Sequence, residues 1–199
     1  WLARTASRLK ETVATLTNLP LILPPVVTGY SLLLLLGPAS PVGTLLDQFG
    51  IPLAFHWSGA AVAAAVMGFP LLVRTGRLTF ESLDPALDQM AATLGLSPMQ
   101  RLLRLSLPQA LPGILAAISL ALAKAMGEFG ATVTFVASIP GQTRTLPLAI
   151  YEASQTPGSE SLAITLALVS ASTSLIVLFW AEQWIRRTTA PSASRDLSV

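Results

Sequence analysis

The sequence predicts an all-α polytopic membrane protein that forms one domain over residues 1–199. Three observations support this fold class: 52% of the residues are hydrophobic, only 11% are charged, and the mean hydropathy is +0.65. Four apolar windows approach the roughly 20 residues that a helix needs to cross a bilayer core. A water-soluble fold with such windows would need polar helix faces elsewhere, and the sequence has too few of them.

The first window, residues 19–37, contains many helix-breaking residues. Pro20, Pro24, Pro25 and Gly29 all lie within it. Irregular backbone is tolerated in a membrane where neighbouring helices or water satisfy the freed carbonyl groups. A kinked span that lines a pore fits this pattern, while Pro20 alone would also suit the start of the span.

The second window, residues 54–73, starts at a predicted outer membrane interface. Trp57 stands at this position, and tryptophan is enriched at membrane interfaces. His56, the only histidine of the chain, precedes it. We interpret this lone histidine as an interfacial residue. With one histidine and no cysteine, the sequence offers neither a zinc site nor a disulfide framework.

The segment 74–111 predicts two short amphipathic helices joined by a glycine turn. Asp84 can cap a first helix that starts at Pro85. Gly95 suits the end of that helix, because the left-handed conformation is easiest for glycine. Four apolar residues recur at helical spacing on one face of the helix: Leu87, Met90, Ala91 and Leu94.

The second helix of this segment begins with a capping box formed by Ser97 and Gln100. We expect it to end before Pro108, because proline interrupts a helix. Three destinations are open for the apolar faces of the two helices: the ends of the chain's own spans, the lipid surface and a groove on a partner protein. Arg101 and Arg104 supply too little affinity for phosphates to support nucleic-acid binding.

The third and fourth windows cover residues 112–137 and 161–181, and the third contains Lys124 and Glu128. The two charges are four residues apart and therefore share one helix face. Charges at this depth are costly, so they usually face a partner or a water-filled path. Two roles are open: a private ion pair that holds helices together, or a Lys124 that offers positive potential to a passing anion while Glu128 anchors a gate.

The basic residues give the spans a direction across the membrane, because short cytoplasmic loops are enriched in lysine and arginine. Alternating spans place ten basic residues on one side and only Arg144 on the other, with Lys124 inside a span. The segment 74–111 is therefore predicted to be cytoplasmic. The start "WLAR" is typical of the interfacial end of a helix, so we expect one further span ahead of residue 1.

The segment 74–111 resembles the coupling loop of permease subunits of ATP-binding-cassette importers. That loop reads Glu-Ala-Ala, three residues, Gly, nine residues, Ile, one residue, Leu-Pro. Gly95 and the run from Leu105 to Pro108 fit this frame, but Gln89 and Met90 replace the glutamate and the first alanine, and Leu105 replaces the isoleucine. The resemblance implies a helix at 86–94 that docks into a separate ATPase through a defined set of residues: Leu87, Met90, Ala91, Leu94 and Gly95.

Three further stretches are similar to permease subunits of molybdate importers: "NLPLILPPVVTGY" at 18–30, "GEFGATVTFVASIPGQTRTLPLAIY" at 127–151 and "QTPG" at 155–158. This resemblance implies a prokaryotic inner-membrane permease that works as two copies with two ATPase subunits and an external oxyanion-binding protein. ATP and magnesium would bind to the ATPase, and this subunit would hold no cofactor. Lys124, Glu128 and Thr28 are the candidates for the anion path or gate, and Arg144 is the candidate of the outer loop.

Several alternatives remain open at this point. A sulfate or thiosulfate importer would share the coupling loop, and tungstate resembles molybdate closely. A channel or ion-driven carrier would need further buried acids or an inverted repeat, and a membrane scaffold would use Lys124 and Glu128 only structurally. The chain has no GxxxxGK[ST] loop, so a nucleotide would bind to another subunit and this chain is not expected to be an enzyme.

Overall fold

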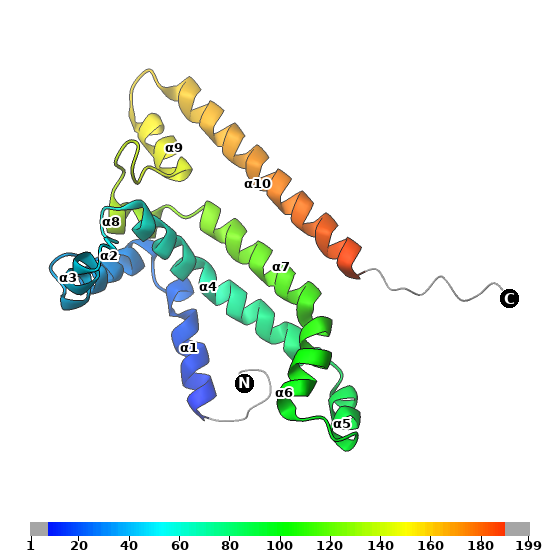
Figure 1. Cartoon of the computed structure of the whole chain (residues 1–199). Helices are drawn as coiled ribbons and strands as arrows, with labels where there is room; N and C mark the ends of the chain where they lie inside the picture. Colours follow the sequence, from blue (N-terminus) through cyan, green and yellow to red (C-terminus); the bar gives the residue numbers. More distant parts are fainter. Residues whose placement is uncertain (1–7, 190–199) are drawn as a thin grey trace.

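The computed structural model describes residues 8–189, and every secondary-structure element in this range is a helix (Figure 1). The predicted all-α class is confirmed, whereas the interfacial reading of "WLAR" and the expected span before it lie outside the described residues. In chain order the elements are α1 (Arg8–Ile22), α2 (Pro25–Leu36), α3 (Pro41–Gln48), α4 (Trp57–Glu81), α5 (Pro85–Thr93), α6 (Pro98–Arg101), the π-helical turn η1 (Leu102–Ser106), α7 (Leu107–Met126), α8 (Gly130–Val136), α9 (Leu146–Gln155) and α10 (Glu160–Thr189).

Among the described residues, three helices are long and apolar enough to cross a membrane, namely Trp57–Glu81, Pro98–Met126 and Glu160–Gln183. A fourth crossing would consist of the pair Thr12–Ile22 and Pro25–Leu36, which is bent by 112°. The helices therefore supply up to four crossings, the number expected from the hydropathy windows.

The bend between α1 and α2 has a local cause in the doubled proline. Pro25 disfavours helical geometry at the residue before it, and Pro24 has an extended backbone with ψ of 135°. Neither proline has an N–H group to continue the hydrogen bonds of α1. The predicted kink is thus present at this position. Pro20 does not mark the start of the span, because it lies inside α1.

The second helix of the segment 74–111 does not end before Pro108, contrary to the expectation from the sequence. It continues from Pro98 through α7 to Met126 as one helix. The π-helical turn η1 explains the difference, because the N–H of Leu107 reaches back to the carbonyl of Leu102. This five-residue step widens the turn where a proline ring would otherwise clash with the carbonyl four residues earlier.

The third predicted window, 112–137, also differs from the structure, because its helix is interrupted. α7 ends at Met126, and α8 starts at Gly130 after a short break that contains Glu128. α8 then packs against α2 and α4, and its Ala131, Phe135 and Val136 form the buried core with residues of α4. α4 and α7 lie side by side, with α5 at one end of the molecule and α3, α8 and α9 towards the other (Figure 1).

Close backbone contact between α2 and α8 depends on Gly29. A Cβ atom at this position would collide with the carbonyl oxygen of Ala131. Lipid tails are as apolar as leucine, so membrane helices associate through such close packing of small residues rather than through exclusion of water. The contact places α8, a seven-residue helix, firmly against the bent first span.

Candidate functional site

The local signals in the segment 74–111 fold as the sequence predicts. Asp84 accepts a hydrogen bond from the N–H of Ala86 at 2.8 Å and so caps α5. Gly95 has a φ of +82°, the left-handed conformation that ends the helix. Ser97 and Gln100 form the complete capping box, with hydrogen bonds of 3.3 Å and 2.9 Å. α5 is therefore a preformed helix with a defined exit angle.

The predicted docking residues separate into two groups. Leu87, Met90 and Leu94 are 41%, 62% and 80% exposed, whereas Ala91 is buried against the rest of the chain. The three exposed side chains form an apolar surface on α5, which projects at one end of the molecule (Figure 1). Ala91 is buried although it shares this helix face, so the structure leaves only part of the predicted set exposed.

Arg101 has a structural role that the sequence did not predict. Its guanidinium Nη1 lies 2.9 Å from Asp88 Oδ2 and also donates a hydrogen bond to the Asp88 carbonyl oxygen at 3.3 Å. These contacts fasten the middle of α5 to α6 across the Gly95 turn. Thirteen residues separate the two partners, so no helical spacing in the sequence indicates the pair. Arg104, in contrast, is exposed.

Lys124 and Glu128 form an ion pair with Nζ to Oε2 at 3.1 Å. The Glu128 side chain is only 2% exposed, and its other oxygen, Oε1, accepts a hydrogen bond from the N–H of Ala131 at 2.9 Å. One carboxylate therefore contacts the end of α7 and the first turn of α8. The Lys124 side chain is 34% exposed, so one partner is buried and the other is accessible. The ion pair that the sequence left as one option is present in the structure.

Thr28 lies on α2, the helix that packs against α8, and its side chain is buried. Its hydroxyl oxygen has no hydrogen-bond partner in the described part of the chain. A buried hydroxyl without a partner costs free energy, because it loses the hydrogen bonds that water would provide. Thr28 thus brings a polar group to α2, and Glu128 brings one to the break before α8, the helix that packs against α2.

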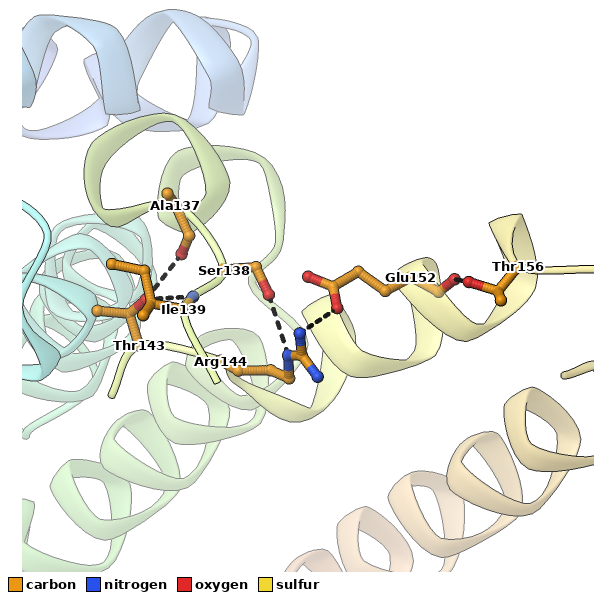
Figure 2. A network of polar contacts seen from close by, with 7 residues as sticks. All are labelled: Ala137, Ser138, Ile139, Thr143, Arg144, Glu152 and Thr156. Atoms are coloured by element: carbon orange, nitrogen blue, oxygen red, sulfur yellow. Dashed lines mark hydrogen bonds and ion pairs between the residues drawn. The ribbon is translucent and has the colours of Figure 1, made fainter. Parts of the chain in front are cut away.

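Arg144 is paired with an acid of α9 (Figure 2). Its Nη2 lies 2.6 Å from Glu152 Oε2, and its Nε donates a hydrogen bond to the Ser138 hydroxyl at 3.4 Å. The Arg144 and Glu152 side chains are each 36% exposed. Arg144 is therefore an accessible, ion-paired side chain, and no pattern in the sequence indicated Glu152 as its partner.

The loop that carries Arg144 is fixed by a second set of contacts drawn in Figure 2. The hydroxyl of Thr143 accepts a hydrogen bond from the N–H of Ile139 at 2.9 Å and donates one to the carbonyl of Ala137 at 3.1 Å. Ala137 has a φ of +58°, a strained value for a residue with a side chain. Buried Thr143 holds this backbone conformation, so the loop keeps a defined shape between α8 and α9.

Residues 8–189 contain no group of three or more His, Cys, Asp or Glu side chains that could hold a metal ion. The polar residues described above are instead distributed over the length of the molecule. One set lies in the α5–α6 segment, a second at the break between α7 and α8, and a third in the loop before α9.

Comparison with known proteins gives matches over most of the chain. Residues 1–190 match the family described as "Binding-protein-dependent transport system inner membrane component". The chain is 47% identical to the Molybdenum transport system permease protein ModB of Escherichia coli (strain K12) over 187 residues, which cover 94% of this chain and 81% of the relative. The identity to the protein of the same name from Haemophilus influenzae is 45% over 179 residues, which cover 89% of this chain and 78% of the relative.

A solved structure has the same fold. It shows inward-facing conformations of the MetNI methionine ABC transporter, and one of its chains superimposes with a TM-score of 0.72. The match covers 92% of this chain and 77% of the other, with 17% sequence identity. At this identity the likeness concerns the arrangement of the helices alone.

Proposed function

Because this chain belongs to the family of binding-protein-dependent transport system inner membrane components, we propose that it is the permease subunit of an ATP-binding-cassette importer for molybdate. The observation that carries the proposal is the identity of 47% over 94% of the chain to a molybdenum transport permease. Membership of the family makes the chain a multi-pass component of the inner membrane and a transport subunit rather than an enzyme. Sulfate and tungstate are the competing substrates.

In the proposed importer, two copies of the permease work with two ATPase subunits and an external binding protein. The ATPase subunits would hold ATP and Mg²⁺, while the binding protein would deliver the oxyanion to the outer face of the prokaryotic inner membrane. The substrate would be selected mainly by the binding protein, since a pore that held a dianion tightly would release it slowly.

The proposed contact with the ATPase is the exposed face of α5. Leu87, Met90 and Leu94 would enter a groove of that subunit as the anchors of an amphipathic helix, and Ala91 and Gly95 would set the position and exit angle of the helix. The ion pair between Arg101 and Asp88 supports this role, because it makes α5 and α6 move together. α6 continues into α7, so displacement of α5 would tilt a whole span.

The proposed anion path or gate lies at the break between α7 and α8. Glu128 would hold α8 in place as part of the gate, Lys124 would offer positive charge to the passing oxyanion, and Thr28 would contribute a hydroxyl from α2. The accessibility of Lys124 and the burial of Glu128 support this division of roles. In the outer loop, Arg144 would face the binding protein or the arriving anion. Glu152 would compete with either of them for the ion pair with Arg144.

Uptake by proteoliposomes tests the proposed function directly. The full-length permease is reconstituted with its ATPase and its binding protein, and uptake of labelled molybdate is measured with tungstate or sulfate as competitor. We expect ATP-dependent uptake that tungstate blocks and sulfate does not. Inhibition by sulfate would keep the architecture but contradict the substrate, and uptake without ATP would contradict the mechanism by indicating a channel or carrier.

Replacement of Lys124 tests the proposed path. We expect Lys124→Ala to slow molybdate uptake on the order of tenfold, because the barrier for the anion rises when the positive charge is removed. Lys124→Arg keeps the charge and serves as the matched control, with uptake close to that of the unmodified protein. Normal uptake by Lys124→Ala, together with a lower melting temperature, would instead assign Lys124 a purely structural role.

A further inference from the structure

The segment between α2 and α4 presents apolar side chains that the rest of the molecule leaves uncovered. Val42, Leu45 and Phe49 are 50%, 53% and 72% exposed, and their spacing of three and four residues places them on one face of α3 and its C-terminal end. The polar residues of this helix are also exposed, but they lie on a different face: Thr44, Asp47 and Gln48. The exposed surface of α3 is therefore amphipathic, with one apolar face and one polar face.

The third face of α3 fixes the helix to the end of α2. Gly43 is buried so close to the backbone of Gly37 that a Cβ atom at position 43 would collide with the Gly37 carbonyl oxygen. Ser40 accepts a hydrogen bond from the Gly43 N–H at 2.8 Å and donates one to the carbonyl of Leu35 at 2.7 Å. These contacts prevent α3 from rotating to bury its exposed apolar face against the protein.

The turn before α4 also presents exposed aromatic side chains. Phe55 has a φ of +58°, which is strained for an aromatic residue, and its side chain is 47% exposed. The Ser58 hydroxyl donates a hydrogen bond to the carbonyl of Pro52 at 2.5 Å, and the His56 side chain caps α4. These contacts hold the strained turn. Trp57, the first residue of α4, is 64% exposed.

The position of this surface relative to the membrane follows from the neighbouring spans. The bent pair of α1 and α2, a candidate for the first crossing, ends at Leu36, and the next crossing begins at Trp57. Residues 37–56 therefore leave and re-enter the bilayer at one boundary. In Figure 1, α3 lies beside α2 at the edge of the molecule, away from α9 and α10.

We propose that α3 and the turn 49–57 form an interfacial anchor in the headgroup region of the outer leaflet. A lipid surface can accept the apolar face of α3 from below while water solvates the polar face above it. The aromatic side chains of Phe49, Phe55 and Trp57 suit this level of the bilayer. The chain has no lysine or arginine between Lys10 and Arg74, so the anchor contacts uncharged or zwitterionic headgroups rather than anionic ones. It fixes the outer ends of two spans in the membrane while the cytoplasmic ends move.

Spin labels on the two faces of α3 test the anchor. The 199 residues contain no cysteine, so single cysteines can be introduced by Leu45→Cys and Phe49→Cys on the apolar face and by Thr44→Cys and Gln48→Cys on the polar face. The labelled full-length permease, with its ATPase, is placed in phosphatidylcholine nanodiscs. The measurement compares access of oxygen, which partitions into lipid, with access of a water-soluble nickel chelate.

We expect the ratio of oxygen access to nickel access to exceed unity at the two apolar positions and to fall below unity at the two polar positions. Nickel access that dominates at all four positions would overturn the proposal, because α3 would then stand in water. Exclusion of both reagents from Leu45 and Phe49 would also overturn it, by indicating a protein partner or a second copy. A ratio that rises above unity only with anionic lipid would contradict the uncharged surface. None of these outcomes depends on the transported substrate.

Discussion

Gly95→Pro is expected to uncouple ATP hydrolysis from molybdate uptake while the membrane spans stay folded. Proline fixes φ near −65°, whereas Gly95 has a φ of +82°. The substitution also removes the N–H that bonds to the carbonyl of Ala92 at 3.0 Å. The turn must therefore rearrange, and the contact between Arg101 and Asp88 that ties α5 to α6 is lost with it. We expect uptake to fall at least on the order of tenfold, while the ATPase still hydrolyses ATP.

The matched control for this turn is Gly95→Asn. Asparagine tolerates the left-handed conformation, and a Cβ atom at position 95 would meet no other atom within 4 Å. We therefore expect proteoliposomes with the Gly95→Asn variant to keep most of their uptake per ATP hydrolysed. Melting curves and helical content of both variants should match those of the unmodified permease. If the proline variant took up as much molybdate per ATP hydrolysed as the unmodified permease, this result would contradict the role of the segment as the link to the ATPase.

Glu128→Ala is expected to destabilise the permease by about 2 kcal/mol, because it removes the buried carboxylate that accepts hydrogen bonds from Lys124 and from the first turn of α8. The loss also leaves the N–H of Ala131, a fully buried residue, without its acceptor. α8 would then lose its connection to the end of α7. The measurement is the melting temperature in detergent or nanodiscs, followed by uptake below that temperature.

Two further variants separate the contacts of this carboxylate. Glu128→Gln keeps an oxygen for the N–H of Ala131 and weakens only the contact with Lys124, so its melting temperature should lie between those of the unmodified protein and Glu128→Ala. The double variant Lys124→Met with Glu128→Gln removes both charges and should lose less stability than the sum of the single changes. Equal melting temperatures for the Ala and Gln variants would show that the hydrogen bond to α8 contributes nothing.

The bent first span illustrates how far local sequence signals reach. The prolines at 24 and 25 predict a break, and the break is present where they stand. Their effect is local, since a proline acts on its own φ, on its missing N–H and on the preceding residue. The angle of 112° and the packing of α2 on α8 could not be predicted in this way, because they depend on Gly29 meeting a helix more than one hundred residues further along the chain.

Pro108 shows the opposite outcome for the same residue type. A local rule predicts that the helix ends before it, yet the helix from Pro98 continues to Met126. The π-helical turn at Leu102–Ser106 makes room for the Pro108 ring, and no spacing of residues in the sequence indicates such a turn. The continuous helix joins the segment 74–111 to a candidate membrane span.

The sequence by itself determined the features that depend on neighbours within a few positions: the apolar spans, the caps at Asp84 and Ser97, the left-handed turn at Gly95 and the closeness of Lys124 to Glu128. Only the tertiary structure decided the contacts between elements. Examples are the pairs of Arg101 with Asp88 and of Arg144 with Glu152, and the burial of Thr28 and Ala91. The physical reason is that caps and turns act through hydrogen bonds within one or two helical turns, whereas these contacts exist only once separate helices have packed together.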